Sequence, residues 1–155
     1  MRLQLGNLRS RTGRHEIESR MTPALQFRLL RLTLFFCAFV WGISICGVFL
    51  SWNAATTALQ GMGAQSIPDD PMLDYWLRMA SGAFALVGTG YFLLALNPRK
   101  FAVMLPWFGS IMLIEGVILL GHGLRLGLGP FPFYGDVAAC FLGGAGIFAF
   151  RKAAQ

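Results

Sequence analysis

Apolar residues form four long runs along the chain, and polar or basic segments separate them. These runs cover residues 32–50, 76–96, 101–121 and 133–150. A helix rises ~1.5 Å per residue, so about 20 apolar residues cross a hydrocarbon core of ~30 Å. The last run is short and rich in glycine, but Arg151 and Lys152 mark its end. The pattern predicts an all-α bundle of four transmembrane helices.

Capping residues predict where the second helix begins. Asp70 followed by Pro71 is typical of an N-cap and a first helical position, so this helix should start at Pro71. Asp74 and Arg78 then lie four residues apart on one helix face and should pair. A shorter helix is expected over residues 52–61, at the membrane interface.

Two prolines predict the shape of the next turn. Asn97-Pro98 should stop helix two, and the link to helix three is so short that the two should form a tight antiparallel hairpin. Pro106 lies one turn into helix three and should kink it.

Basic residues collect at one end of the predicted bundle. Lysine and arginine near membrane ends stay on the cytoplasmic side, and 11 of the 13 basic residues fall on one side of these spans. Both termini should therefore be cytoplasmic, in the inner membrane of a bacterium. Residues 1–28 form a basic cytoplasmic arm, and residues 29–155 form the membrane domain.

The arm has two interpretations. Arg9, Arg11, Arg14 and Arg20 would attract anionic lipid, at about 1 kcal/mol per basic residue near the surface, or dock a neighbouring subunit. Met21 is an alternative start to Met1.

Composition supports the membrane interpretation. Of 155 residues, 55% are hydrophobic and only 13% are charged, against about 25% charged in soluble domains. This excludes a disordered chain, a disulfide-stapled secreted domain and an ordinary soluble enzyme. The net charge of +6 is mostly a topology signal, and no nucleic-acid partner is expected.

Glu115 is the most informative residue for function. It lies ~21 Å along helix three from Phe101, inside the predicted hydrocarbon region, where a carboxylate is costly and usually has a partner. His122 lies near the same face. We expect Glu115 to pair with Arg78, so that Glu115, Arg78, His122 and Asp74 form an intramembrane polar group. This group is either a clasp for helix packing, a contact to a partner helix, or a site for a proton, ion, quinone head group or lipid.

Small residues predict close helix contacts. Gly82, Gly88, Gly143 and Gly144 would let helix backbones approach closely, which matters in lipid because no hydrophobic force acts between helices. They serve packing within the bundle, and one small face is left for a partner helix or a lipid.

Metal and cofactor chemistry finds little support. Cys37, Cys46 and Cys140 fall inside predicted spans without paired metal spacing, so we expect buried free thiols, no metal and no cofactor. His15 and His122 cannot form a bis-His haem site between helices. One shared ligand to a pigment or haem of another subunit stays open.

A family resemblance rests on short motifs. Residues 77–82 (LRMASG), residues 88–91 (GTGY), the Asn97-Pro98-Arg99 turn and Glu115-Gly116 resemble the pattern of small four-helix bacterial membrane proteins, including DoxX-like and related uncharacterised families. The resemblance implies a four-helix fold over roughly residues 25–150. Some DoxX-like proteins are linked to quinone-reducing sulfur oxidation, and most such families have no assigned activity.

Together these patterns favour a non-catalytic accessory or scaffold subunit of a larger, energy-transducing membrane complex. Its partners would be membrane lipids and other membrane subunits. The alternative is a small transporter or a quinone- or lipid-binding protein that uses the polar group around Glu115. An integral membrane enzyme is not expected, because one carboxylate and one histidine are too few groups for it.

Overall fold

The computed structural model describes residues 22–155, which are almost entirely helical and contain no strand. Four helical segments in this part of the chain are long and apolar enough to cross a membrane: Pro23–Phe49, Pro71–Leu96, Ala102–Leu126 and Phe133–Ala154. The predicted fold class, an all-α bundle with four transmembrane helices, is thereby confirmed. The predicted arm arginines Arg9, Arg11, Arg14 and Arg20 lie outside the described residues.

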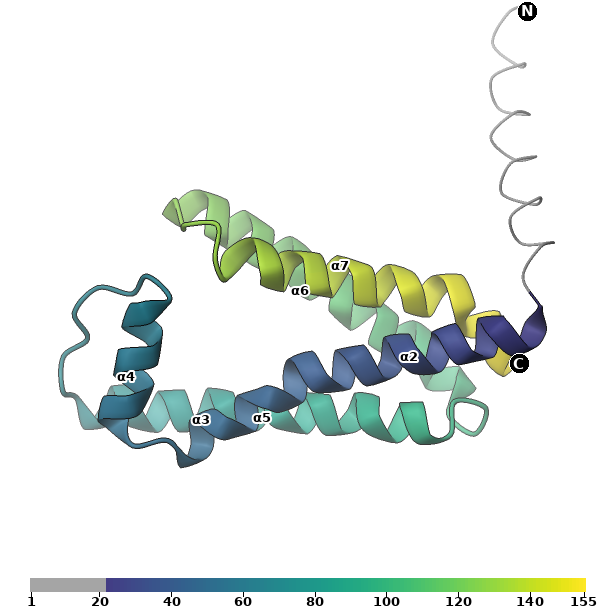
Figure 1. Cartoon of the computed structure of the whole chain (residues 1–155), viewed down its shortest axis with the longest axis horizontal. Coiled ribbons are helices and arrows are strands. Elements are labelled where there is room, and N and C mark those ends of the chain that lie inside the picture. Colours follow the sequence, from purple (N-terminus) through teal and green to yellow (C-terminus); the bar gives the residue numbers. More distant parts are fainter. Residues whose placement is uncertain (1–21) are drawn as a thin grey trace, which may run out of the picture.

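Most helices follow one another through short connections, and a longer loop joins α4 to α5 (Figure 1). In chain order they are α2 (Pro23–Gly42), η1 (Ile43–Ile45), α3 (Cys46–Phe49), α4 (Trp52–Gly61), α5 (Pro71–Leu96), η2 (Ala102–Met104), α6 (Leu105–Leu126), α7 (Phe133–Phe150) and η3 (Arg151–Ala154). Helix α2 begins and α7 ends at the same end of the bundle, which we call the terminal end. The opposite end, where α4 lies, is the loop end.

Local signals placed several helix boundaries correctly. Helix α5 begins at Pro71, and the Asp70 side chain accepts a hydrogen bond of 2.7 Å from the backbone N–H of Met72. The helix ends at Leu96, immediately before Asn97-Pro98. Helix α4 covers residues 52–61 as expected.

Helix α6 differs from expectation at both ends. It begins at Leu105, so Pro106 lies in its first turn, where no intrahelical N–H bond is lost and no kink follows. It also continues past the apolar run, because Gly127 with φ of +61° supplies the left-handed residue that ends it. Arg125, which follows the apolar run 101–121, therefore lies in the last helical turn.

The bundle consists of two helix pairs, α2 with α5 and α6 with α7, and contacts between α2 and α7 join them. Helices α2 and α3 pack on α5, α6 packs on α7, and α2 also contacts α7. The predicted tight hairpin of α5 and α6 is wrong, since these helices touch mainly near their connection, where the Tyr91 hydroxyl donates a 2.8 Å hydrogen bond to the Phe108 carbonyl. From there α6 runs away from α5 alongside α7 (Figure 1). The cause is that the small residues of α6 face α7.

Glycines lie at the closest helix contacts. A Cβ on Gly88 would come within 2.5 Å of the Gly42 backbone nitrogen, so α2 and α5 meet backbone to backbone. A Cβ on Gly143 would lie 2.7 Å from Cys37 Sγ, and one on Gly144 would lie 2.6 Å from Leu113 Cδ2. Gly82 differs from these three, because its Cβ would meet nothing nearer than Val48 Cγ2 at 3.9 Å.

The exterior of the bundle is apolar. Large side chains such as Phe49, Val103 and Trp107 are 75–82% exposed, while the core around Leu34, Tyr91 and Met112 is closed. Such a surface is suited to lipid and not to water.

Replacing Gly88 by alanine should destabilise the protein by about 1–3 kcal/mol, because the α2 and α5 backbones would have to separate. Thermal unfolding of the purified protein in detergent measures this. Gly82→Ala is the matched control and should be neutral or slightly stabilising, since the helix gains alanine's propensity without a clash. Equal losses in the two variants would contradict the assigned contact.

Candidate functional site

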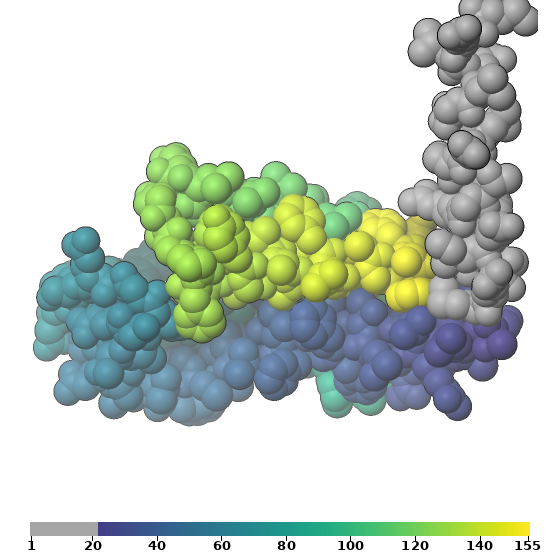
Figure 2. All heavy atoms as spheres, turned by 45° about the horizontal axis from the view of Figure 1, so that its top comes forward, coloured from purple at the N-terminus to yellow at the C-terminus, as the bar shows by residue number. Residues whose placement is uncertain are grey.

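A cavity lies between the two helix pairs, in the half of the bundle toward the loop end. Its inner chamber has a volume of about 210 Å³ and is lined from all four spanning segments, by Val40, Trp41, Ser44, Phe84, Glu115, Leu119, Asp136 and Cys140. An outer chamber of about 540 Å³ adjoins it and shares Leu119 and Asp136. The outer chamber is bounded by the C-terminal part of α4 and by the α6–α7 connection, two segments that face each other in Figure 2.

Two carboxylates line the inner chamber. Glu115 of α6 is half-buried, and Asp136 of α7 is more exposed and borders both chambers. Within residues 22–155, neither carboxylate has an ion pair or a side-chain hydrogen bond to another residue. No buried side-chain nitrogen or oxygen in this part of the chain lacks a partner, so the Glu115 oxygens reach open space instead of being sealed in the core.

Two aromatic rings in the remaining wall of the inner chamber are held in place by their neighbours. The Trp41 ring packs edge-on against Phe84 with centroids 5.2 Å apart, and its indole N–H points at Met112 Sδ at 2.9 Å. Ser44 donates its hydroxyl to backbone carbonyls, including that of Ser81 at 3.2 Å. The carboxylates therefore face apolar surface and one hydroxyl.

The predicted pairing of Glu115 with Arg78 is wrong. Arg78 forms an ion pair of 2.8 Å with Asp74, as its spacing on the helix indicated. The reason is the arrangement of helix pairs: α5 packs on α2 and α3, whereas Glu115 belongs to the other pair. The expected polar group is thus divided between two places.

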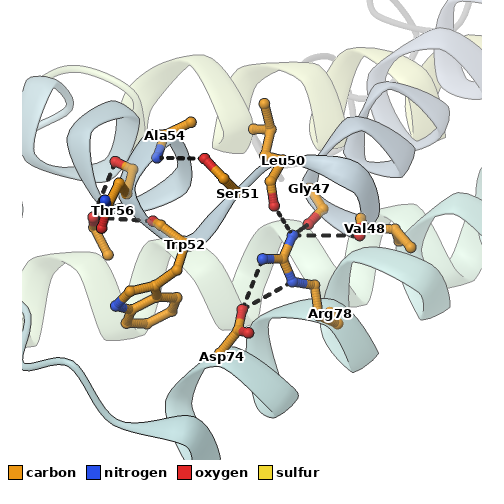
Figure 3. Close-up of polar contacts among 10 residues, drawn as sticks. Gly47, Val48, Leu50, Ser51, Trp52, Ala54, Thr56, Asp74 and Arg78 are labelled. Carbon is orange, nitrogen blue, oxygen red and sulfur yellow. Dashed lines mark hydrogen bonds and ion pairs between the residues drawn. The ribbon is translucent and has the colours of Figure 1, made fainter.

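Arg78 binds the end of the first spanning segment (Figure 3). Its Nη1 donates to the carbonyls of Gly47 at 2.8 Å, Val48 at 3.3 Å and Leu50, while its Nε donates to Asp74 at 2.9 Å. These carbonyls have no partners within a helix, because α3 ends at Phe49. The positive charge also suits the negative end of a helix dipole. We call this arrangement the Arg78 clasp.

The clasp holds the chain where it turns into α4. Ser51 follows Leu50 directly, and its hydroxyl oxygen accepts a hydrogen bond from the Ala54 N–H and caps α4 (Figure 3). Arg78 thus fixes the base of the helix that bounds the outer chamber.

His122 lines the outer chamber but is exposed and apart from Glu115. Its Nδ1 lies 3.3 Å from Arg125 Nη2. Arginine has only donors, so Nδ1 accepts in this contact and the imidazole proton is on Nε2.

Asp136 was not predicted as a site residue. It lies in the first turn of the last helix. Because α6 and α7 are antiparallel, the first turn of α7 faces the later turns of α6, where Glu115 and His122 lie. Combining the helix order with the position of Asp136 would have found it.

Metal binding finds no support in the described part of the chain, where no three His, Cys, Asp or Glu side chains come close enough to hold an ion. The cysteines of this part are free thiols; Cys37 and Cys140 are buried, but Cys46 is exposed, contrary to the expectation that all three are buried.

Comparisons with known proteins add no name to this geometry. No protein-family profile matches the chain, and no curated protein and no solved structure shows significant similarity to it.

Replacing Arg78 by glutamine should destabilise the protein by about 1.5–3 kcal/mol, because the carbonyls at the end of α3 lose their charged donor. Asp74→Asn leaves those bonds in place and should cost less than about 1 kcal/mol, as exposed ion pairs do. Thermal unfolding in detergent compares the two. If Asp74→Asn costs as much as Arg78→Gln, the ion pair and not the carbonyl contacts stabilises the turn.

Proposed function

We propose that this multi-pass membrane protein binds a small amphipathic ligand between its two helix pairs, with Glu115 as the principal contact and Asp136 and His122 nearer the mouth. The observation that supports this most directly is the cavity that reaches Glu115. Had the helices closed over this carboxylate, only a packing role would remain.

The charges define the ligand class. A carboxylate at membrane depth needs a cation, a hydrogen-bond donor or a proton, and none of the arginines in the described chain supplies it: Arg78 is engaged in the clasp and Arg125 contacts His122. A ligand with an amine, a hydroxyl or a hydroquinone ring on an apolar body would satisfy the carboxylate and cover the Trp41 and Phe84 rings. This is the quinone- or lipid-binding alternative of the sequence analysis, without the Arg78 contact.

The size of the cavity agrees with such a ligand. Small-molecule sites are typically ~300–1,000 Å³, mostly apolar, with a few polar groups that fix orientation. The inner chamber alone accommodates a head group, and the outer chamber gives it a route past α4. The weak DoxX-like resemblance, with its link to quinone chemistry, points to the same ligand class.

Ligand binding can be measured through Trp41 fluorescence, with decylubiquinol and the lipophilic cation tetraphenylphosphonium as probes. At least one probe should change the emission, and Glu115→Gln should weaken its binding by tenfold or more because the charged acceptor is lost. Asp136→Asn should have a smaller effect. Asp69→Asn removes the same charge outside the cavity and is the control.

Two results would contradict the proposal. One is unchanged affinity in Glu115→Gln for a probe that binds the native protein. The other is a Trp41→Phe variant that keeps the full fluorescence response, since the signal would then come from another tryptophan.

An accessory subunit of a larger complex is the second proposal. It is favoured by the same uncompensated carboxylates, because a lysine or arginine on a neighbouring subunit's helix would also satisfy Glu115. In that case mild-detergent purification from the native membrane yields a stoichiometric partner, and Glu115→Gln weakens its retention. A protein that purifies alone and still binds a probe favours the first proposal.

The basic terminal end leads us to place both termini in the cytoplasm of a bacterium, with the cavity opening outward. Green fluorescent protein fused after Gln155 should therefore be fluorescent, and alkaline phosphatase fused after Gly63 should be active. The opposite pair of results would show that both termini lie outside the cytoplasm.

A further inference from the structure

A second cavity lies on the outside of the α2–α5 pair, away from the carboxylates. This groove has a volume of about 430 Å³ and is open along one side. Its floor is formed where small residues bring the two helices together, and its sides are aromatic. It is lined by Phe35, Phe39, Gly42, Ala85, Thr89 and Phe92, among others.

The groove runs along a single seam. On α2 and the following η1 its residues recur every three or four positions from Phe35 to Ile45, and on α5 they do so from Ala85 to Phe92. Ten residues of helix correspond to ~15 Å, which is half of a ~30 Å hydrocarbon core. The groove therefore has the length of an acyl chain in one leaflet.

Two arginines close the seam at the terminal end. Arg31 lies one turn before Phe35 on α2; its guanidinium is 5.8 Å from the Phe35 ring centroid, and its Nε donates to the Ala95 carbonyl at 3.1 Å. Arg99 comes from the turn after α5 and lies 4.9 Å from the centroid of Phe27, one turn before Arg31. Arg31 therefore continues the row of groove residues on α2, and Arg99 continues the row on α5 just beyond the end of that helix.

Among residues 22–155, the charged side chains at this end all have one sign. Arg99 has no hydrogen bond or ion pair to a side chain of residues 22–155, and Arg31 uses only its Nε. All acidic side chains of these residues lie at the middle of α6, on α7 or toward the loop end, so none neutralises the two arginines. Guanidinium groups match phosphate oxygens in charge and in geometry.

We propose that this seam binds one anionic phospholipid, with an acyl chain in the groove and the phosphate on Arg31 and Arg99. The rings of Phe35 and Phe92 form a T-shaped contact with centroids 6.0 Å apart. In this arrangement they lie between the phosphate and the acyl chain and pack on the part of the chain nearest the phosphate. This site is separate from the cavity at Glu115 and does not depend on the function proposed for it. It is also the small-residue face that remains available to a lipid.

Native mass spectrometry of the purified protein tests the site, with phosphatidylglycerol and phosphatidylcholine of identical acyl chains as probes. The native protein should retain one phosphatidylglycerol in preference to phosphatidylcholine. Arg31→Gln combined with Arg99→Gln should lower its affinity for phosphatidylglycerol about 30-fold, the change that corresponds to ~1 kcal/mol for each of two basic residues. Binding of phosphatidylcholine should not change.

Two further variants distinguish the contribution of the two arginines from that of the apolar groove. Arg151→Gln combined with Lys152→Gln removes the same charge at the same end, but on the segment after α7, and should leave the preference intact. Thr89→Trp fills the groove from an exposed position and should lower the affinity for both lipids at least tenfold. Arg99→Gln alone, which breaks no hydrogen bond to a described residue, gives a partial effect even if the double variant folds poorly.

Three results would overturn the assignment. Equal loss in the Arg151/Lys152 control would show diffuse attraction to a basic surface. Unchanged lipid binding in Thr89→Trp would show that the acyl chain does not lie in the groove. A change in oligomer mass in Thr89→Trp would show that a second copy of the chain occupies the groove.

Discussion

The contact between α2 and α5 at Gly42 and Gly88 is the constraint on which the remaining arrangement depends. In lipid, helices gain little from burying apolar surface, so van der Waals contact between closely packed backbones has to hold them together. A Cβ at position 88 would collide with the Gly42 backbone, whereas one at position 42 would meet nothing within 4 Å, so the close approach depends on Gly88. With one face of α2 engaged by α5, its other face contacts α7, and α6 follows α7. The two pairs therefore diverge, and a cavity remains between them.

Polar groups are distributed according to this division. Arg78 is on a helix that packs against α3, so it satisfies carbonyls at a helix end that lipid could not satisfy. Glu115 is on the other pair, where no cation of the described chain reaches it. One side chain thus completes the fold, and the other is left for an external partner.

Local features of this chain were readable from its sequence, and contacts between helices were not. The four spans, the Asp70 cap, the end of α5 and the Asp74–Arg78 pair follow from residues within one or two turns of each other. Pro106 was expected one turn into helix three but lies in its first turn. The helix also extends beyond residue 121, since an apolar run marks hydrocarbon depth and a helix continues until a residue such as Gly127 ends it. The Glu115–Arg78 pairing failed for a different reason. A short link was assumed to keep α5 and α6 together. Which helix faces pack against each other depends instead on glycines that are far from each other in sequence, such as Gly109 of α6 and Gly144 of α7. The cavity and the role of Asp136 follow from the same nonlocal choice.

The contact of Tyr91 with Phe108 gives the bundle a mechanical property. It joins α5 and α6 near one end of α6, and roughly 27 Å of that helix extends beyond Phe108. Helix α7 is also held against α2 at Gly143, so the part of the α6–α7 pair nearer the loop end projects beyond these contacts. A tilt of about 5° at the Tyr91–Phe108 contact displaces the far end of α6 by roughly 2 Å, at the ~1.5 Å rise per residue of a straight helix. Small adjustments between two aromatic rings would thus change the width of the mouth far more than the packing of the core.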